Sequence, residues 1–477
     1  MTQHFDAIVI GTGQAGPPLA ARLSAAGMKV AIVERGRFGG TCVNTGCIPT
    51  KTLIASAYAA QLARRAGEYG VSVGGPVTVD MKAVKARKDQ ISGRSNHGVE
   101  QWVRGLANTT VFQGHARFER ADAVRVGDEL LEAERIFINV GGRAQVPPMP
   151  GLDSVPYLTN STMMDVDFLP EHLVIVGGSY VGLEFGQMYR RFGSKVTIVE
   201  KGSRLIRRED DDVSQAVREI LENEGIDVQL DANCLSARRD GDGDGDGDGN
   251  GNGNGNGNGN GIVIGLDCAG GGREVAGSHL LLAVGRVPNT DDLGLDRAGV
   301  ETDARGYITV DEQLRTNVPG IWALGDCNGR GAFTHTAYND YEIVAANLLD
   351  ADPRKVSDRI AAYAMYIDPP LGRVGMTLAE AKQTGRKLLV GTRPMTRVGR
   401  AVEKGESQGF MKVIVDADSH AILGASILGV TGDEVVHGML DVMAAGAPYT
   451  TISRAMHIHP TVSELVPTLL QDLHPVE

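Results

Sequence analysis

A glycine-rich turn between a predicted strand and a predicted helix occurs twice in this chain, and no other feature constrains its fold as strongly. The first copy covers residues 5–26 and is followed by a strand at residues 29–34. The second covers residues 173–192 and is followed by a strand at residues 195–200. Each copy is a strand–helix–strand unit, and such units build parallel sheets that are covered by helices. The sequence therefore predicts an α/β fold with an internal repeat.

Each copy carries the glycines and the acid that dinucleotide binding requires. Glycines let the backbone approach a pyrophosphate, the helix N-terminus faces its charge, and a carboxylate on the next strand accepts hydrogen bonds from ribose hydroxyls. One match alone can be only a tight turn, but two matches in this context predict two Rossmann-like dinucleotide-binding domains. The residues are Gly11, Gly13, Gly16 and Glu34 in the first copy, and Gly177, Gly178, Gly182 and Glu200 in the second.

The length and composition indicate several domains with ordinary cores. The chain has 477 residues, of which 42% are hydrophobic and 22% charged, and this is too long for a single core. Its formal net charge of −12 opposes non-specific binding to nucleic acid or to an anionic membrane surface. The N-terminus enters an apolar strand at residues 7–10 without the features of a secretory signal. We therefore expect a cytoplasmic protein that binds neither nucleic acid nor membrane.

A low-complexity segment, residues 240–261, alternates Gly with Asp and then with Asn. It offers no apolar group to bury and its backbone entropy is high, so we expect a disordered loop. It lacks the apolar position of calcium-binding nonapeptide repeats, which disfavours metal binding there. Strand-like residues 226–230 precede it and residues 261–266 follow it, so the loop is expected to join two strands of the second dinucleotide domain.

The sequence changes character after about residue 350. Residues 361–376, 409–415 and 421–428 are strand-rich, and a helix is predicted around residues 433–445. This pattern predicts a third, separate domain of the α+β class at the C-terminal end of the chain.

Two of the five cysteines, Cys42 and Cys47, lie close together before a helical stretch at residues 52–65. They can close a small disulfide ring if the backbone turns, and Gly46 supplies that freedom. When reduced, a thiolate there would be stabilised by the helix N-terminus and by a cation such as Lys51. This spacing by itself also suits a pair of buried reduced cysteines. The two dinucleotide units beside the pair favour a redox function.

The segment around these cysteines resembles a family signature. Residues 39–51 read Gly-Gly-Thr-Cys-x-Asn-x-Gly-Cys-x-Pro-x-Lys, which is similar to the signature of the class I pyridine nucleotide-disulfide oxidoreductases. This family includes dihydrolipoamide dehydrogenase, glutathione reductase and mercuric reductase. Three further motifs extend the resemblance over nearly the whole chain: residues 316–326, which end in Ala-Leu-Gly-Asp, residues 285–289, and His459-Pro460-Thr461 with Glu464.

The resemblance implies a flavin-dependent NAD(P)H:disulfide oxidoreductase with FAD and NADH or NADPH as cofactors. Cys47 would be the thiol that contacts the flavin, and Cys42 the interchange thiol that meets a small disulfide substrate. Lys51 and Glu184 would pair beside the flavin, and Tyr180 would cover the nicotinamide pocket until the coenzyme displaces it. These are the roles that the family's motifs assign to the matching positions.

The resemblance also implies a homodimer with shared active sites and a set of cofactor contacts. His459, held by Glu464, would act as a base from the partner subunit. The FAD contacts would come from Gly11, Gly13, Gly16, Glu34, Thr41, Lys51, Gly114, Gly141, Asp326, Thr334 and His335, and the NAD(P)H contacts from Gly177, Gly178, Gly182, Glu200 and Gly285.

The implied domain organisation follows the order of these motifs. Residues 1–150 and 286–350 would form a discontinuous FAD-binding domain. Residues 151–285, with the Gly/Asp/Asn loop, would form the NAD(P)-binding domain, and residues 351–477 a dimerisation domain.

The coenzyme and the electron acceptor depend on finer features. Ser179 replaces the middle glycine of the second turn, and its hydroxymethyl group narrows the approach to a pyrophosphate. Glu200 suits a free ribose 2′-hydroxyl and would repel a 2′-phosphate, which favours NADH. Four nearby cations would instead hold a 2′-phosphate: Lys201, Arg204, Arg207 and Arg208.

Several functions remain open besides the reduction of a disulfide. Mercuric-reductase-like reduction of a soft metal ion lacks support from an N-terminal Cys-x-x-Cys domain or from vicinal cysteines in residues 472–477, and a soft metal needs thiolates that receive it. An NAD(P)H:quinone or oxygen oxidoreductase, a transhydrogenase and a binding module without enzymatic activity also remain open. The His459 motif favours thiol chemistry over each of these functions.

Overall fold

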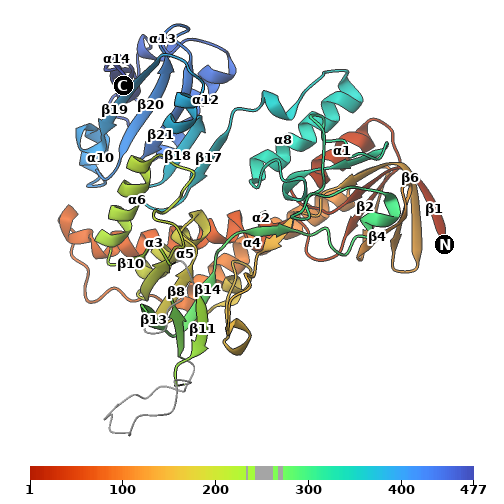
Figure 1. Ribbon diagram of the computed structural model, residues 1–477, viewed down its shortest axis with the longest axis horizontal. Helices are drawn as coiled ribbons and strands as arrows, with labels where there is room; N and C mark the ends of the chain where they lie inside the picture. The colour runs from red at the N-terminus through yellow and green to blue at the C-terminus, as the bar shows by residue number, and fades with distance from the viewer. Residues whose placement is uncertain (233–234, 242–260, 267–271, 477) are drawn as a thin grey trace.

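The computed structural model describes residues 1–232, 235–241, 261–266 and 272–476 of the chain. The chain forms three groups of elements, and each contains a β-sheet with helices (Figure 1). The predicted α/β fold class is confirmed. Residues 242–260, which contain most of the Gly/Asp/Asn repeat, lie outside the described residues. The prediction that this segment is a disordered loop concerns these residues and stays a prediction.

The first group is a seven-stranded sheet built around the first glycine turn. Its order is β3-β2-β1-β6-β5-β4, with β16 paired to β6. Strands β1 and β2 are parallel with Ala7 opposite Val30, and β1 and β6 are parallel with Ala7 opposite Arg135, so the predicted βαβ unit is formed. The strands are β1 (Thr2–Ile10), β2 (Val30–Glu34), β3 (Thr109–Gln113), β4 (Ala116–Arg120), β5 (Ala123–Val126), β6 (Glu129–Ile138) and β16 (Ile321–Ala323).

Helices cover this sheet and bury their apolar faces against it. Helix α1 crosses between β1 and β2 and buries Leu19 and Leu23. The other elements of this group are α2 (Gly40–Asn44), β7 (Gly142–Ala144), β15 (Arg286–Pro288), α7 (Leu295–Ala298), η4 (Gly325–Asn328) and α8 (Thr334–Ala345), with α1 at Gly16–Ala25. Strands β7 and β15 pair in antiparallel fashion and connect this group to the second.

The second group repeats the plan of the first beyond the glycine turn. Its parallel sheet has the order β10-β9-β8-β14, and a separate antiparallel sheet has the order β11-β12-β13. In the first group one long strand, β6, belongs to both the parallel and the antiparallel part, whereas here Ser278 separates β13 from β14. The elements are β8 (His172–Val176), α5 (Tyr180–Phe192), β9 (Lys195–Val199), α6 (Asp211–Asn223), β10 (Asp227–Gln229), β11 (Ser236–Arg239), β12 (Ile262–Gly265), β13 (Glu274–Gly277) and β14 (His279–Leu282).

The strand before the Gly/Asp/Asn repeat differs from the expectation. Residues 226–230 contain β10, which lies beside β9 in the parallel sheet. The strand that leads into the repeat is β11, and it pairs in antiparallel fashion with β12, with Arg239 opposite Ile262. Its four residues, Ser-Ala-Arg-Arg, have too little apolar character for the pattern to reveal them.

Two helices of the N-terminal region, α3 (Cys47–Arg64) and α4 (Met81–Arg104), pack against each other. Helix α3 lies beside α5 of the second group (Figure 1), whereas α4 also contacts β3 and α1 of the first group. Leu53 and Ala57 of α3 share an apolar core with Leu183 and Phe185 of α5. Helix α3 begins at Cys47, earlier than the predicted Thr52, with Gly46 at its N-cap.

The third group is a six-stranded antiparallel sheet with the order β17-β18-β21-β20-β19-β22. All the strand-rich segments of the prediction form strands here, and the predicted helix is divided into α11 and α12. Strand β19 was not predicted. The elements are β17 (Ala362–Met365), β18 (Leu371–Gly375), α9 (Leu378–Gln383), β19 (Leu388–Pro394), α10 (Gly399–Glu403), β20 (Phe410–Asp416), β21 (Ile422–Leu428), α11 (Gly432–Val435), α12 (His437–Ala444), α13 (Thr450–Ser453), α14 (Leu465–Gln471) and β22 (His474–Pro475).

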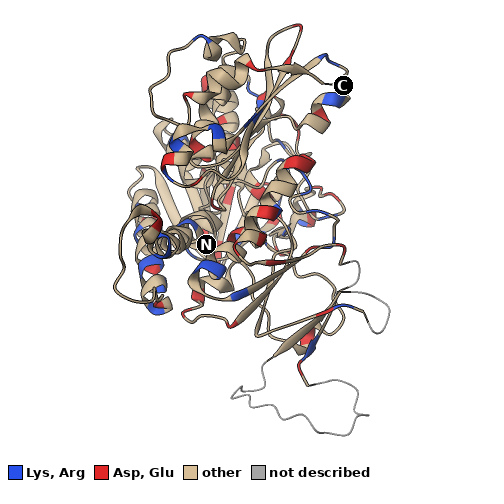
Figure 2. Ribbon diagram, turned by 90° about the vertical axis from the view of Figure 1, so that its left-hand side faces the viewer, with Lys and Arg blue, Asp and Glu red and all other residues tan. Residues whose placement is uncertain are grey.

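Charged side chains of both signs are interspersed over the helices and loops (Figure 2). Among the helices in the described part of the chain, none combines the length and the apolar character needed to cross a membrane.

Candidate functional site

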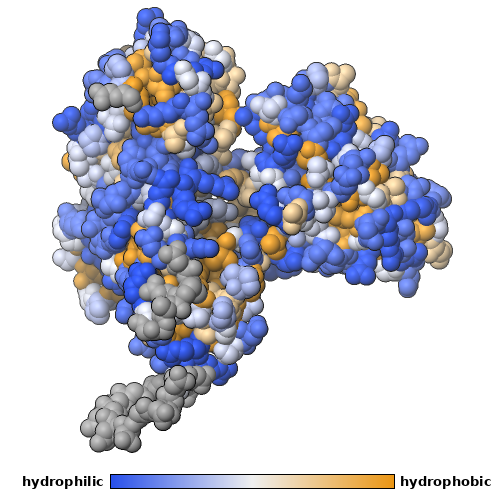
Figure 3. Space-filling view, viewed as in Figure 1, coloured by the Kyte–Doolittle hydropathy of each residue, from blue (hydrophilic) through white to orange (hydrophobic). Residues whose placement is uncertain are grey.

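A large cleft runs between the three groups of elements. Its volume is about 2790 Å³, several times the roughly 300–1,000 Å³ that suits one drug-sized ligand. Both glycine turns, both cysteines of the pair and residues of the C-terminal sheet line it. The surface is hollowed between the C-terminal group and the first sheet (Figure 3). A cleft of this size suits long ligands such as dinucleotides.

The first glycine turn lines this cleft through Gly11 and Gly13. Gly11 has φ +105°, and a Cβ there would lie 2.3 Å from the carbonyl oxygen of Asn139. A Cβ at Gly16 would lie 2.1 Å from the carbonyl oxygen of Gly11. Glu34 ends β2 and accepts the backbone N–H groups of Thr12 (3.0 Å) and Gly36 (2.8 Å). The turn is therefore closed tightly, with a carboxylate at its edge.

The second turn repeats this geometry almost atom for atom. Gly177 has φ +122°, and a Cβ there would lie 2.3 Å from the carbonyl oxygen of Ala283, while a Cβ at Gly182 would lie 2.0 Å from the carbonyl oxygen of Gly177. Glu200 accepts the N–H groups of Gly178 and Gly202, both at 2.7 Å.

The position of the missing middle glycine explains why a side chain is tolerated there. Ser179 is the N-cap of α5 and has φ −113°, which any residue adopts. Its counterpart Gly13 is more crowded, because the backbone of Gly40 approaches it: a Cβ at Gly40 would lie 2.8 Å from the Cα of Gly13.

The two cysteines come from consecutive helices that meet at a glycine. Cys42 lies on α2, and Cys47 is the first residue of α3. Both are free thiols. A Cβ at Gly46 would lie 2.9 Å from the carbonyl oxygen of Thr41, so the connection between the helices is tight. The helices thereby bring the two sulfurs within hydrogen-bonding range of each other.

The electrostatics of the pair are asymmetric. A hydrogen bond from Cys42, a second from Thr334 and the positive charge of Lys51 lower the pKa of Cys47 to about 6. The Thr334 hydroxyl lies 3.1 Å from the Cys47 sulfur. The same contact with Cys47, together with burial, raises the pKa of Cys42 far above its ordinary value. At neutral pH the reduced pair therefore holds one thiolate, on Cys47, and one thiol, on Cys42.

Lys51 is fixed beside Cys47 by a buried acid. Its Nζ lies 2.7 Å from Glu184 Oε2, and the Glu184 side chain is only 5% exposed. The other oxygen of Glu184 accepts the backbone N–H of Tyr366 at 2.9 Å, and Lys51 Nζ lies 4.4 Å from the centroid of the Tyr366 ring. No sequence pattern pointed to Tyr366, because it follows β17 in the C-terminal sheet and belongs to no motif.

Tyr180 is the first residue of α5 and lines the cleft. Its ring centroid lies 5.7 Å from that of Phe333. Burial raises the pKa of its hydroxyl, so the side chain is neutral over the physiological range.

Asp326 lies in the short helix η4, and Arg286 Nε is 3.3 Å from its carboxylate. Burial raises the pKa of Asp326, and Arg286 opposes that shift. Asp340 fixes the backbone of η4, because its carboxylate accepts hydrogen bonds from the N–H of Gly325 (2.7 Å) and from the side-chain amide of Asn328 (2.8 Å). Asp340 is 2% exposed and also pairs with Arg359. Sequence reasoning missed it, since it lies within an ordinary helix.

The remaining candidate cofactor contacts also line the cleft. Gly285 and Gly141 have left-handed backbone conformations, with φ +133° and +65°. Gly114 donates its N–H to the carbonyl of Glu34 at 2.9 Å. His335 Nε2 lies 2.7 Å from the carbonyl oxygen of Ala362, and burial lowers the pKa of its ring. Thr41 lies 3.5 Å from Arg286 Nη2.

His459 and Glu464 are close to each other but do not line the cleft of their own chain. Nδ1 of His459 lies 2.9 Å from Glu464 Oε2. The His459 side chain is 82% exposed, and the neighbouring residues Met456 and Ile458 are 99% and 79% exposed. The structure thus brings the cysteine pair together with Lys51, Glu184 and Tyr180, and places His459 on an outer surface with bare apolar neighbours.

Comparison with known families gives two matches that together cover most of the chain. Residues 5–340 match the family described as pyridine nucleotide-disulphide oxidoreductase. Residues 361–470 match the dimerisation domain of the same family.

Similar curated proteins carry three kinds of name. A probable pyridine nucleotide-disulfide oxidoreductase, RclA of Escherichia coli, is 34% identical over 96% of this chain and 97% of its own. A mercuric reductase of Streptomyces lividans is 32% identical over 96% of this chain and 94% of its own. A dihydrolipoyl dehydrogenase of Haloferax volcanii is 32% identical over 97% and 94%.

A solved structure matches over nearly the whole chain. It is described as a Cu(II) complex of the HOCl-induced flavoprotein disulfide reductase RclA from Escherichia coli, and it is 33% identical with a TM-score of 0.86. The match covers 98% of this chain and 99% of that one.

Proposed function

Since the chain belongs to the pyridine nucleotide-disulphide oxidoreductase family, we propose that it reduces a small disulfide with electrons from NAD(P)H, through FAD and the Cys42/Cys47 pair. It is a flavin-dependent oxidoreductase, and the cofactors of the family are FAD and NAD(P)H. The observation that carries the proposal is the asymmetric cysteine pair in the cleft between two dinucleotide turns.

The residues around the first turn fit FAD. Gly11 and Gly13 of the turn line the cleft where a pyrophosphate would bind, and Glu34 offers a carboxylate to a ribose. Asp326, Thr334 and Lys51 would hold the remainder of the molecule near the cysteines. When bound there, FAD supplies two-electron chemistry between the nicotinamide and the cysteine pair.

The cysteines would carry the thiol chemistry in a fixed order. The Cys42 thiolate attacks one sulfur of the substrate disulfide, which forms a mixed disulfide and releases the first substrate thiol. The Cys47 thiolate then attacks the Cys42 sulfur, which closes the Cys42–Cys47 disulfide and releases the second substrate sulfur as a thiolate that takes its proton from solvent. The low pKa of Cys47 supports this order, since Cys47 is already a thiolate at neutral pH and needs no base for the second attack.

Cys42 needs a base, because its pKa is raised. We assign that role to His459 of the partner subunit, which takes the Cys42 proton and gives it to the first leaving thiolate. The exposure of His459 beside Met456 and Ile458 supports a position in a subunit interface, and the dimerisation domain supports a homodimer. Glu464 orients the imidazole.

The second turn would bind the coenzyme. Tyr180 would cover the nicotinamide position in the free enzyme, and Lys51, held by Glu184, would favour negative charge beside the cysteines. We propose NADH as the preferred coenzyme, because Glu200 lies at the edge of the turn, where it would repel a 2′-phosphate. The predicted domain division, with boundaries near residues 150, 285 and 350, is kept as part of this proposal.

A second candidate acceptor is a soft metal ion. A relative with 32% identity is named mercuric reductase, and the structural relative is described as a Cu(II) complex. The same pair of sulfurs would receive such an ion, since thiolates are the ligands that soft metals prefer.

A panel of acceptors separates these functions. Purified holoenzyme would be supplied with NADH and with small disulfides, Hg(II), Cu(II), quinones or oxygen in turn. We expect a disulfide to give the highest kcat/KM, and Cys42→Ser and Cys47→Ser variants to lose that activity. Metal reduction that exceeds disulfide turnover would support the second candidate. Quinone or oxygen reduction that persists in both variants would instead indicate an oxidase or quinone reductase.

A further inference from the structure

The ring of Phe333 is surrounded by rings from all three groups of elements. Tyr363 of β17 lies parallel to it, with an interplanar angle of 2° and centroids 5.7 Å apart. Tyr180 of α5 lies at 5.7 Å, and His335 of α8 stacks at 5.4 Å. All four residues line the cleft. Tyr180 therefore rests against an aromatic wall that ends at Tyr363.

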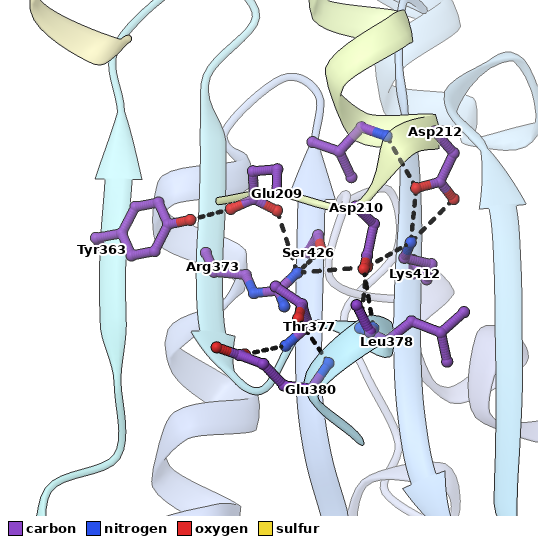
Figure 4. A network of polar contacts seen from close by, with 12 residues as sticks. Glu209, Asp210, Asp212, Tyr363, Arg373, Thr377, Leu378, Glu380, Lys412 and Ser426 are labelled. Carbon is purple, nitrogen blue, oxygen red and sulfur yellow. Dashed lines mark hydrogen bonds and ion pairs between the residues drawn. The ribbon is translucent and has the colours of Figure 1, made fainter. Parts of the chain in front are cut away.

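Tyr363 is anchored at its other end by a buried acid. Its hydroxyl donates a hydrogen bond to Glu209, which is 3% exposed (Figure 4). Burial and the charge of Glu209 raise the pKa of Tyr363, so this hydroxyl stays protonated. Arg373 Nη1 lies 3.2 Å from Glu209, and Arg373 is 1% exposed. Such an anchor fixes the tilt of the Tyr363 ring, because a phenol bonded to a buried carboxylate cannot change rotamer freely.

The anchor belongs to a row of side chains across the C-terminal sheet. Tyr363 is the cross-strand partner of Arg373, Arg373 of Ser426, and Ser426 of Lys412. The row therefore runs over β17, β18, β21 and β20, and Arg373 donates to Ser426 at 2.6 Å. Figure 4 shows these side chains facing the segment that leads into α6.

Lys412, at the other end of the row from Tyr363, also contacts the segment that leads into α6. Lys412 Nζ lies 2.8 Å from Asp210 and 2.7 Å from Asp212. The segment is also joined to the second glycine turn, because Ile206 donates its N–H to the carbonyl of Gly178 at 2.8 Å. Tyr363, at one end of the row, thus stacks with Phe333 in the cleft, whereas Lys412, at the other end, contacts the segment that leads into α6 and does not line the cleft.

We propose that Tyr363, Glu209 and Arg373 are positioning residues by which the C-terminal sheet sets the nicotinamide end of the coenzyme site. Glu209 and Arg373 fix the orientation of the Tyr363 ring, and this ring fixes Phe333. Phe333 in turn supports Tyr180 in the position where it covers the nicotinamide site. The inference rests on the proposed function, in which Tyr180 covers the nicotinamide position. None of the three residues needs to touch the coenzyme for this role.

Tyr363→Phe tests the anchor with the loss of one oxygen. The ring and its stacking partner remain, but the bond to Glu209 is lost. Because Tyr180 is then displaced more easily, we expect the Kd of the holoenzyme for NADH, measured by fluorescence titration with NAD⁺ as a second probe, to fall about three- to tenfold, the size of one hydrogen bond. The Kd for ADP-ribose, which lacks the nicotinamide, should change by less than about twofold, and the FAD content should not change.

Lys412→Met is the matched control. It removes a buried cation from the same row and is expected to lower the melting temperature, yet it does not touch Tyr363. Its Kd for NADH should stay within about twofold of wild type. Phe333→Leu is a second test for the case in which Tyr363→Phe does not fold. This half-buried site tolerates the change, and the loss of the ring should lower the Kd for NADH while sparing ADP-ribose.

Three results would overturn the inference. They are an unchanged or raised Kd for NADH in Tyr363→Phe and Phe333→Leu, an equal fall for NADH and ADP-ribose, or a fall in Lys412→Met as large as in Tyr363→Phe. Failure of the proposed function is a different observation, because the wild-type holoenzyme itself would then bind or oxidise neither NADH nor NADPH.

Discussion

The sulfur of Cys47 lies where several stabilising groups meet. It is the first residue of an 18-residue helix, where the free N–H groups of the first turn and the helix dipole favour negative charge. Cys42 and Thr334 bond to it, and Lys51 lies one helical turn further along α3. Thr334 itself begins α8, so the starts of two helices converge on this sulfur. The thiolate is a consequence of the local geometry of these side chains and helix starts.

The first prediction concerns the pH dependence of this thiolate. Because the pKa of Cys47 is lowered to about 6, the reduced pair should hold its thiolate above about pH 6 and lose it as the pH falls through that value. Thr334→Val removes one of the hydrogen bonds to the thiolate, and the midpoint should rise by about 0.5–1 unit. The rate of alkylation of the reduced protein against pH measures this midpoint.

Thr52→Val is the control, because the Thr52 hydroxyl donates to the carbonyl of Ile48 and does not reach the sulfur. Its midpoint should equal that of wild type. Equal midpoints in all three proteins would show that Thr334 does not stabilise the thiolate.

At the residue scale, motifs predicted the groups that lie in a continuous segment. Cys42, Cys47 and Lys51 could be placed together from the sequence, because one turn and one helix join them. Tyr366 and Asp340 could not be found in this way. Their partners are distant in sequence, and nothing in an isolated Tyr or Asp indicates a buried contact.

At the element scale, the glycine turns show why the repeat was recognisable. In both copies a Cβ on the first glycine would meet a carbonyl oxygen at 2.3 Å, so glycine is required by the backbone itself. The strands of the C-terminal sheet were visible from their apolar runs. Strand β19 was not, because Leu-Leu-Val-Gly-Thr-Arg-Pro has only a short apolar run and ends in Pro. Its place comes from pairing with β20 over seven residues.

The second prediction concerns the loop that carries Asp326. Asp340→Ala leaves the N–H of Gly325 and the amide of Asn328 without their acceptor and leaves Arg359 without its counter-charge. Removing one partner of a buried pair costs about 3–5 kcal/mol. We expect a lower free energy of unfolding of this size and a reduced FAD content in the purified protein, measured by denaturant titration and by flavin absorbance.

Asp350→Ala provides a matched control, because Asp350 pairs with Arg22 on the surface and is 47% exposed. An exposed pair contributes only about 0–1 kcal/mol, so stability and FAD content should hardly change. If Asp340→Ala retains both wild-type stability and full FAD, then the buried carboxylate does not support the loop.

At the scale of the whole molecule, all three groups of elements contribute to one cleft. Helices α2 and α3 bring the cysteines, the second group brings Glu184 and Tyr180, and β17 with the residue after it brings Tyr363 and Tyr366. The order of the motifs indicated the first two contributions. The third depends on the register of β17, β18, β21 and β20, which aligns four side chains that no sequence pattern connects.

The third prediction tests whether two subunits share one site. His459→Ala should slow disulfide turnover by about 10²–10⁴-fold, the usual contribution of a positioned acid–base group. Cys42→Ser should be inactive with disulfides. If His459 acts across the interface, heterodimers of the two variants contain one intact site, and a mixture refolded together should regain activity. A mixture as inactive as both parents would place His459 and Cys42 of the same chain in one site.

The central claim, that electrons pass from NAD(P)H to the Cys42/Cys47 pair, is tested most directly by an anaerobic titration of the oxidised holoenzyme with NADH. Flavin absorbance and free thiols would be followed together. We predict that the first equivalent of NADH produces the thiols of Cys42 and Cys47 while the main flavin absorbance is largely retained, and that Cys47→Ser gives no new thiols. Bleaching of the flavin by the first equivalent, without any new thiols in the wild-type protein, would contradict the account.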